Sequence, residues 1–171
     1  MRVTRIEFPL SPGADAGRGV HLLRTTARIE RPVDEVFEFF AAAENLERIT
    51  PPSLRFRIVT PLPLEMRVGA LIDYRLRLNG VPFSWRTEIT EWNPPHAFTD
   101  SQLRGPYHTW IHRHTFEADG KATIMVDEVR HRLPLWPFGE VALPLVRRQL
   151  RSIFTYRASA LEKIFGATPR D

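Results

Sequence analysis

The chain contains no cysteine among its 171 residues. Disulfides, thiolate metal sites and cysteine nucleophiles are therefore excluded. It also lacks a hydrophobic run near the roughly 18 residues that a membrane-spanning helix needs. Its first ten residues, MRVTRIEFPL, do not contain the apolar core of a signal peptide. These absences predict a cytoplasmic protein with no stable membrane insertion.

Several common motifs are missing as well. The sequence has no phosphate-cradling glycine loop, no dinucleotide-binding fingerprint and no Ser/His/Asp order. Basic residues are in slight excess, with 24 Lys and Arg against 20 Asp and Glu, for a net charge of +4. The arginines are spread along the chain beside acids and form no block, so we expect a solvated arginine-rich surface and no nucleic-acid binding.

What the chain does have is the composition of one globular domain. Hydrophobic residues make up 43% and charged residues 26% of the sequence, which suits a single domain with a sizeable core. We place this domain at residues 20–166. Residues 9–19, PLSPGADAGRG, are small, polar and turn-rich, so residues 1–19 are predicted to be a leading segment and a mobile loop. Residues 167–171 form a C-terminal tail.

Helix signals occur near the start and at the end of this domain. After a first strand at about 20–31, Pro32 opens a short helix with Asp34 and Glu35 in its first turn. A second short helix, AENLERI, ends before Pro51. A long helix is expected at about 139–165, because apolar residues recur there at three- and four-residue steps. These residues are Val146, Leu150, Ile153, Phe154, Leu161, Ile164 and Phe165.

The segment between these helices consists of predicted strands, and residues 71–89 form a hairpin. Asn79-Gly80 is a strong signal for a two-residue turn. Pairing Leu78 with Val81 then sets Tyr74 opposite Trp85 on one face and Asp73 opposite Arg86 on the other.

A second hairpin, residues 107–131, carries the most unusual pattern in the chain. Its predicted turn is Asp119-Gly120, and pairing Ala118 with Lys121 sets His112 opposite Asp127 and His114 opposite Met125. The other face carries the charged residues Arg113, Glu117, Glu128 and Arg130, which belong in water. The histidines and Asp127 therefore face inward, where an unpaired polar group costs about 1–3 kcal/mol. One another, water or a ligand must satisfy them.

The strand before this hairpin adds two more polar candidates. Asp100 and Gln102 alternate along HAFTDSQL and share one face. A three-residue loop that pairs Leu103 with Tyr107 turns both side chains inward, whereas a two-residue loop turns them outward. We favour the inward arrangement.

Together these elements predict an α+β fold. Six strands joined by short turns form an antiparallel meander, and only the terminal helix is long enough to cover its buried face. A curved sheet that grips one helix leaves a space in which a pocket can form. Leu150, Phe154 and Leu161 would close it as a lid. The candidate ligand-binding residues are Tyr74, Trp85, Asp100, Gln102, Trp110, His112, His114, Met125, Asp127 and Phe154.

The stretch GPYHTWIHRHTFEADGKATIMVDEVRHRLP, followed by VRRQLRSIFTYRASALEKIF, resembles a bacterial subgroup of the SRPBCC superfamily. This superfamily includes START-like lipid-transfer domains, pollen-allergen-like proteins and polyketide cyclases. The residues that carry the resemblance are Gly105, Pro106, Tyr107, Trp110, His112, His114, Phe116, Met125, Asp127, Val129, Phe154, Tyr156 and Arg157. His131 departs from the pattern, since the subgroup usually has tyrosine there. The resemblance covers about residues 20–166 and implies a helix-grip fold, with a seven-stranded curved sheet wrapped around the C-terminal helix.

Three chemical interpretations of the polar residues stay open. We favour a hydrogen-bonded pair in which Asp127 fixes the tautomer of His112. A general acid/base role for these two residues is the next alternative. His-x-His on a strand could also ligate zinc or iron, with Asp127 as a third ligand. We assign no metal and no other cofactor. Tyr156 and Arg157 could reach the cavity mouth from the helix, but we favour a surface salt bridge for Arg157, and we expect His131 in solvent.

The leading functional hypothesis is binding of a hydrophobic or amphipathic small molecule, including aromatic ones, between the sheet and the terminal helix. The resemblance also implies a cyclase/dehydrase-type enzyme that uses His112 with Asp127. A third possibility is an accessory module that interacts with a protein partner, such as an oxidoreductase or an epimerase-like protein.

Overall fold

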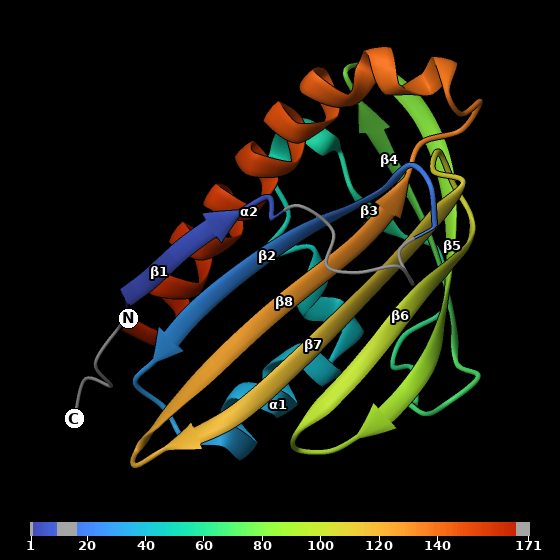
Figure 1. Ribbon diagram of the computed structural model, residues 1–171. Helices are drawn as coiled ribbons and strands as arrows, with labels where there is room; N and C mark the ends of the chain where they lie inside the picture. Colours follow the sequence, from blue (N-terminus) through green and yellow to red (C-terminus); the bar gives the residue numbers. More distant parts are fainter. Residues whose placement is uncertain (1, 10–16, 167–171) are drawn as a thin grey trace.

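The computed structural model describes residues 2–9 and 17–166 (Figure 1). One antiparallel sheet and a long C-terminal helix form the α+β helix-grip architecture that the sequence predicts. The sheet has eight strands rather than seven, because the leading segment contributes an edge strand. Most of the predicted mobile loop (10–16) and the predicted tail (167–171) lie outside the described residues.

The strands follow one another across the sheet in the order β1-β2-β8-β7-β6-β5-β4-β3. Their bounds are β1 Arg2–Glu7, β2 Val20–Ile29, β3 Arg57–Ile58, β4 Leu71–Leu78, β5 Val81–Asn93, β6 Ala97–Arg104, β7 Thr109–Asp119 and β8 Ala122–Arg132. Strands β3 to β8 form the predicted meander, and β2 pairs with β8.

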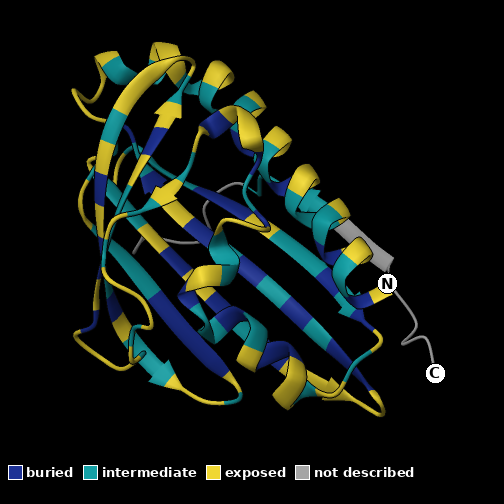
Figure 2. Ribbon diagram, turned by 180° about the vertical axis from the view of Figure 1, so that it is seen from behind, coloured by how far each residue is buried: buried dark blue, intermediate teal, exposed yellow. Residues whose placement is uncertain are grey.

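The helices are α1 Val33–Ala41 and α2 Leu143–Gly166, with 3₁₀ turns η1 Ala43–Leu46, η2 Pro52–Leu54 and η3 Phe138–Ala142. The long helix thus begins later than predicted, because the chain at 138–142 winds as a 3₁₀ turn. Both helices lie on the same side of the sheet (Figure 2). None of the helices in the described ranges is long and apolar enough to cross a membrane.

The β4–β5 hairpin has the predicted register. Leu78 pairs with Val81, and Tyr74 lies opposite Trp85. Asn79 and Gly80 both have positive φ, at 49° and 84°, as a two-residue turn that matches the strand twist requires. On the outer face Arg86 donates two hydrogen bonds of 2.8 Å to the Asp73 carboxylate.

The predicted register of the β7–β8 hairpin is wrong by two residues. The loop residues are Gly120 and Lys121, so Asp119 pairs with Ala122, and His114 rather than His112 lies opposite Asp127. Gly120 supplies the positive φ (64°) at the first loop position. Because side chains alternate with a period of two, a two-residue shift keeps the predicted inner face inside.

Apolar side chains pack closely over the sheet's inner face at one end. Phe37 and Phe40 of α1 pack with residues from four strands and the last turns of α2, and we call this cluster the filled core. Its buried members are Ala27, Ile29, Val36, Phe37, Phe40, Ile49, Phe98, Phe116, Met125, Leu161 and Phe165. Along β5 the pairing with β6 is irregular at two places, between Arg86 and Thr87 and between Ile89 and Glu91. Such bulges bend a strand, and the sheet here curves toward α2.

Candidate functional site

Beyond the filled core, the space between the sheet and α2 is hollow. The cavity has a volume of about 150 Å³. Strands β4 to β7 form one wall, and Leu150, Ile153 and Phe154 of α2 form another. An outer groove lined by Arg77 and Arg148 shares Leu54 and Ile153 with the cavity. The groove therefore adjoins the cavity at these two side chains.

Aromatic rings make much of the cavity wall. Tyr74 and Trp85 are stacked, with ring centroids 5.8 Å apart, and Trp110 meets Trp85 edge-on at 5.3 Å. Thr87 contacts the polar atoms of two of these rings. Its hydroxyl accepts the Trp85 indole N–H at 3.1 Å and lies 3.2 Å from the Tyr74 hydroxyl. The rings consequently offer mainly apolar faces to the cavity. Burial, assisted by the negative charge of Asp100, raises the pKa of Tyr74 and keeps it neutral.

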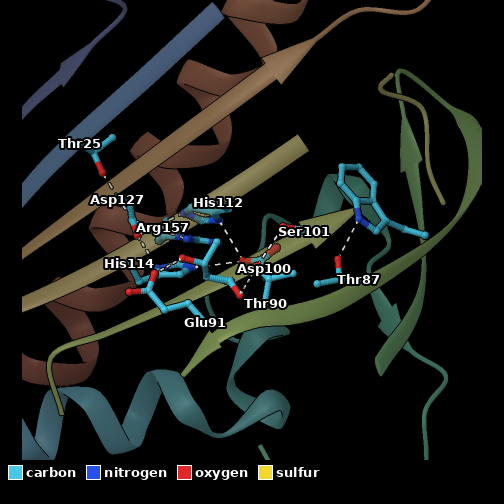
Figure 3. A network of polar contacts seen from close by, with 12 residues as sticks. Thr25, Thr87, Thr90, Glu91, Asp100, Ser101, His112, His114, Asp127 and Arg157 are labelled. Atoms are coloured by element: carbon cyan, nitrogen blue, oxygen red, sulfur yellow. Dashed lines mark hydrogen bonds and ion pairs between the residues drawn. The ribbon is translucent and has the colours of Figure 1, made fainter. Parts of the chain in front are cut away.

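A compact polar cluster lies where the cavity meets the filled core (Figure 3). The rings of His112 and His114 are 3.9 Å apart between two carboxylates. On the cavity side, Asp100 Oδ2 lies 3.6 Å from His112 Nδ1 and 3.4 Å from His114 Nε2. On the far side, Asp127 Oδ1 lies 3.3 Å from His112 Nε2 and 2.6 Å from His114 Nδ1.

These contacts are close, but they do not form a complete hydrogen-bond network. Within residues 2–9 and 17–166, no aligned hydrogen-bond partner exists for His112 Nε2, His114 Nδ1 or Asp127 Oδ1. The histidine side chains are only 7% and 6% exposed, so bulk water does not take this role. Electrostatic attraction therefore holds much of the cluster together.

Burial and charge act differently on the three groups. Desolvation and the neighbouring His114 lower the pKa of His112, which favours a neutral imidazole. Desolvation alone would lower the pKa of His114 as well, but attraction to Asp127 and Asp100 outweighs it, and the pKa is raised. For Asp127, desolvation is likewise outweighed by the two histidines, so its pKa lies well below the usual range. The cluster thus favours a neutral His112 beside a His114–Asp127 ion pair.

Arg157 borders this cluster from α2, which corrects the predicted surface position. Its side chain is 12% exposed, its guanidinium lies 5.0 Å from the Phe154 ring centre, and Nη1 is 3.7 Å from Asp127 Oδ2. Thr25 Oγ1 approaches the same Asp127 oxygen at 3.5 Å. Arg157 also lines the cavity. A positive charge therefore stands between the carboxylate and the cavity.

Most of the predicted site residues line the cavity, namely Tyr74, Trp85, Asp100, Trp110, His112, His114 and Phe154. Met125 instead packs in the filled core, as does the predicted lid residue Leu161. Asp127 stands behind the histidines and does not line the cavity.

Gln102 is also absent from the cavity wall, because its amide binds the backbone of the β6–β7 loop, which is longer than the predicted three-residue loop. Asp100 pairs with His112, and the strands are joined through residues 105–108. Gln102 folds over this loop, donates to the Tyr107 carbonyl at 2.7 Å and accepts from the Tyr107 N–H at 3.4 Å. A Cβ on residue 105 would collide with the Gln102 side-chain amide, so Gly105 leaves room for this position of Gln102.

Sequence reasoning missed part of the cavity and one buried histidine. Residues of η1, η2 and the following loop, such as Ala43, Leu54 and Met66, line the cavity but show no periodic pattern. Arg157 was detectable, since it lies three residues after Phe154 on the same helix face. His131 is fully buried rather than solvated.

With this geometry in view, comparison with known proteins identifies the family. Residues 29–155 match the family described as polyketide cyclase / dehydrase and lipid transport. The chain belongs to this family. No curated protein matches the chain.

Solved structures with the same fold are distant in sequence. Protein Ms6760 from Mycobacterium smegmatis is 18% identical, with a TM-score of 0.65 and coverage of 95% of this chain and 97% of that one. The Zhui aromatase/cyclase from Streptomyces sp. R1128 is 16% identical, with a TM-score of 0.62 and coverage of 85% and 96%. Ginseng major latex-like protein 151 from Panax ginseng is 12% identical, with a TM-score of 0.60 and coverage of 86% and 98%. At such identities the likeness establishes the fold alone.

Proposed function

We propose that this protein binds a hydrophobic or amphipathic small molecule with an aromatic portion in the cavity between the sheet and α2. One observation carries the proposal: apolar and aromatic walls enclose a small group of polar side chains at one end of the cavity. Ligand sites commonly combine apolar walls with a few polar groups that set orientation. Here apolar burial supplies affinity, while Asp100, His112 and Arg157 orient a polar substituent of the guest.

The aromatic wall favours a flat guest. Tyr74 and Trp85 are nearly parallel, with an interplanar angle of 19°, and their polar atoms are already engaged by Thr87. A planar ligand can therefore stack on a ring without leaving an indole N–H or a phenol hydroxyl unpaired. We infer that the guest enters beside Leu54 and Ile153, where the outer groove adjoins the cavity.

A thermal-shift series with palmitate, cholesterol and a flat polyphenol tests this proposal. A ligand that binds only the folded protein raises its melting temperature, and the rise grows with the logarithm of the ratio of ligand concentration to Kd. We expect the flat polyphenol to stabilise most and to quench the fluorescence of Trp85 and Trp110. A flat response to all three compounds, together with a native mass spectrum free of bound molecules, contradicts the proposal.

Two alanines of one core cluster provide a matched pair of variants. Ala43 and Ala70 are both buried, but only Ala43 lines the cavity. Replacing either residue by leucine overpacks the cluster and lowers stability by about 1–3 kcal/mol. Only Ala43→Leu should weaken polyphenol binding, by at least tenfold. Equal effects of the two variants would place the ligand elsewhere.

A cyclase/dehydrase-type reaction is the second candidate. It is supported by the position of His112, which turns Nε2 toward Asp127 and Nδ1 toward the cavity-lining Asp100. A side chain held in this way can transfer a proton at a bound substrate. His112→Phe would then abolish turnover and leave polyphenol binding largely intact, whereas loss of binding alone favours the first proposal. The cytoplasmic location, the protein partner and the lack of nucleic-acid binding remain predictions from the sequence.

A further inference from the structure

Three potential metal-ligand atoms converge at the end of the cavity. Asp100 Oδ2, His112 Nδ1 and His114 Nε2 belong to a group whose ligand atoms all lie within 4.8 Å of one another. Asp100 Oδ2 lies 3.6 Å from His112 Nδ1 and 3.4 Å from His114 Nε2. Ligands placed roughly 2.0–2.2 Å from a tetrahedral zinc ion lie about 3.3–3.6 Å apart. Both distances from Asp100 match this spacing, and the two histidine nitrogens lie within 4.8 Å of each other.

The second nitrogen of each ring meets the same carboxylate. His112 Nε2 and His114 Nδ1 both face Asp127 Oδ1, at 3.3 and 2.6 Å. In metal sites a carboxylate commonly contacts the outer nitrogen of a ligating histidine and so fixes the ring orientation and the tautomer. Asp127 is in turn approached by Thr25 and Arg157. One buried carboxylate thus orients both rings.

With the rings oriented by Asp127, the three potential ligand atoms can be stabilised by a cation between them. When the proton of each ring is on the nitrogen that faces Asp127, His112 Nδ1 and His114 Nε2 both present lone pairs to the Asp100 carboxylate. Three acceptors would then converge in a space from which bulk water is largely excluded. Either a proton shared with Asp100 or a metal ion relieves the repulsion.

We propose that Asp100, His112 and His114 bind one divalent first-row transition-metal ion, zinc or ferrous iron. Two histidines and one carboxylate form a donor set that suits both ions. All three residues line the cavity, so the coordination positions they leave free open toward the bound guest. A guest with an oxygen donor would complete the coordination. The metal site itself does not depend on the proposed small-molecule binding.

Cobalt(II) is the probe for a direct test, because its visible absorption reports the coordination geometry. The full chain, first treated with a chelator, is titrated with Co²⁺, and the bound Co²⁺ is then displaced with Zn²⁺. We expect one equivalent to bind with micromolar or tighter affinity and to give the absorption of a four- or five-coordinate ion. No absorption change, or a spectrum of the hexaaqua ion only, overturns the proposal in favour of the shared proton.

Variants separate ligands from supporting residues. His112→Phe and His114→Phe keep a ring in place and should each weaken Co²⁺ binding at least 100-fold. Asp127→Asn should weaken it about 10- to 100-fold, as is usual for groups that orient a ligand. His131→Phe removes another buried imidazole from the same hairpin and should change the affinity less than twofold. Retention of full affinity in both ligand variants overturns the assignment.

A measurement on the unaltered chain covers the case in which a variant fails to fold. Histidine ring ¹H–¹⁵N correlation spectra are recorded with and without one equivalent of Zn²⁺. We expect large shifts of the His112 and His114 nitrogens and little change for His21 and His131. Shifts confined to other histidines contradict the proposal. Thermal-shift titration with the polyphenol in metal-free protein shows separately whether the cavity binds its guest, so failure of one proposal is distinguishable from failure of the other.

Discussion

The two ends of the same sheet face are built from similar residues but are packed differently. In the filled core, Phe116 meets the rings of Phe37, Phe40 and Phe98 at centroid distances of 5.4–6.1 Å. At the other end, where β4 and β5 curve toward α2, aromatic rings of similar size surround a cavity of about 150 Å³. Alternation of apolar residues therefore specifies which side is buried, while the bend of the sheet decides whether that side is solid.

The boundary between the two ends carries the buried charge. Phe98 of the filled core stacks on His114 at a centroid distance of 4.2 Å, and both Phe98 and Asp100, two residues later, line the cavity. The polar cluster thus rests against the packed ring of Phe98 on one side and opens toward the cavity on the other. A rigid support is what a binding or catalytic group needs in order to keep its geometry.

Truncating one side chain at each end gives the largest expected difference. Phe116→Ala removes a ring from the filled core and should lower the free energy of unfolding by about 3–5 kcal/mol. Leu76→Ala should cost about 2 kcal/mol, because Leu76 already borders a void and fewer contacts are lost. Urea denaturation measures both values. Equal losses would mean that the cavity end is as tightly packed as the core.

Ligand binding should respond in the opposite order. Leu76→Ala enlarges the cavity, so polyphenol affinity should change severalfold, whereas Phe116→Ala should leave it nearly unaltered in the protein that remains folded. A larger effect from Phe116→Ala would indicate that the filled core also takes part in binding.

The same contrast explains which features could be predicted from the sequence. Alternation placed His112, His114 and Asp100 inside, and it did so even where the turn was misassigned, because the β7–β8 error was an even number of residues. The Asn79-Gly80 turn determined the register of the β4–β5 hairpin, since both residues adopt positive φ. Asp119 instead stays in its strand, where its carboxylate accepts a hydrogen bond of 2.7 Å from Arg28.

Contacts between distant segments could not be predicted in this way. Leu54 and Met66 reach the cavity from irregular chain, and β1 forms a strand only by pairing with β2. The His112–Asp127 contact survived the register error because neighbouring rings on one strand both reach the same carboxylate. The periodicity of apolar residues predicts which face of a strand or helix is buried. It does not predict which other segment packs against that face.

Acid should weaken the cavity end selectively, through His131. This residue contacts Tyr107 and Trp110 of the cavity wall, and burial, together with the charge of His21, lowers its pKa to about 4. The unfolded chain, with an ordinary histidine pKa of 6.5, binds the proton more readily. The free energy of unfolding therefore keeps its full value above pH 6.5. It falls by about 3 kcal/mol as the pH drops from 6.5 toward 4 and below.

The control for this prediction is His131→Phe, which has no titrating ring at this position. Urea denaturation at pH 7 and pH 4.5 should show a smaller loss of stability in the variant than in the unaltered protein. The filled core contains no titratable residue among its buried members, so amide exchange there should change least. An identical pH dependence in both proteins would show that other groups cause the acid effect.

The smallest expected effects come from two ion pairs on the outer face, one over each end. Arg86 makes two hydrogen bonds of 2.8 Å to Asp73 on β4, and Arg113 makes two of 3.0 Å to Glu91 on β5. In each pair the arginine hydrogen bonds lower the pKa of the carboxyl. Both carboxylates are 38% exposed, so water and salt screen them equally.

Replacing either acid by its amide should therefore cost less than about 1 kcal/mol. Glu91 also accepts the Thr99 hydroxyl at 2.7 Å, so Glu91→Gln should cost slightly more than Asp73→Asn. Denaturation at low and high salt checks this, because the difference between each variant and the unaltered protein should shrink as salt is added. A loss well above 1 kcal/mol for Asp73→Asn alone would mean that this pair holds the bend of β4 and β5, and that the cavity depends on the outer face as well as the inner one.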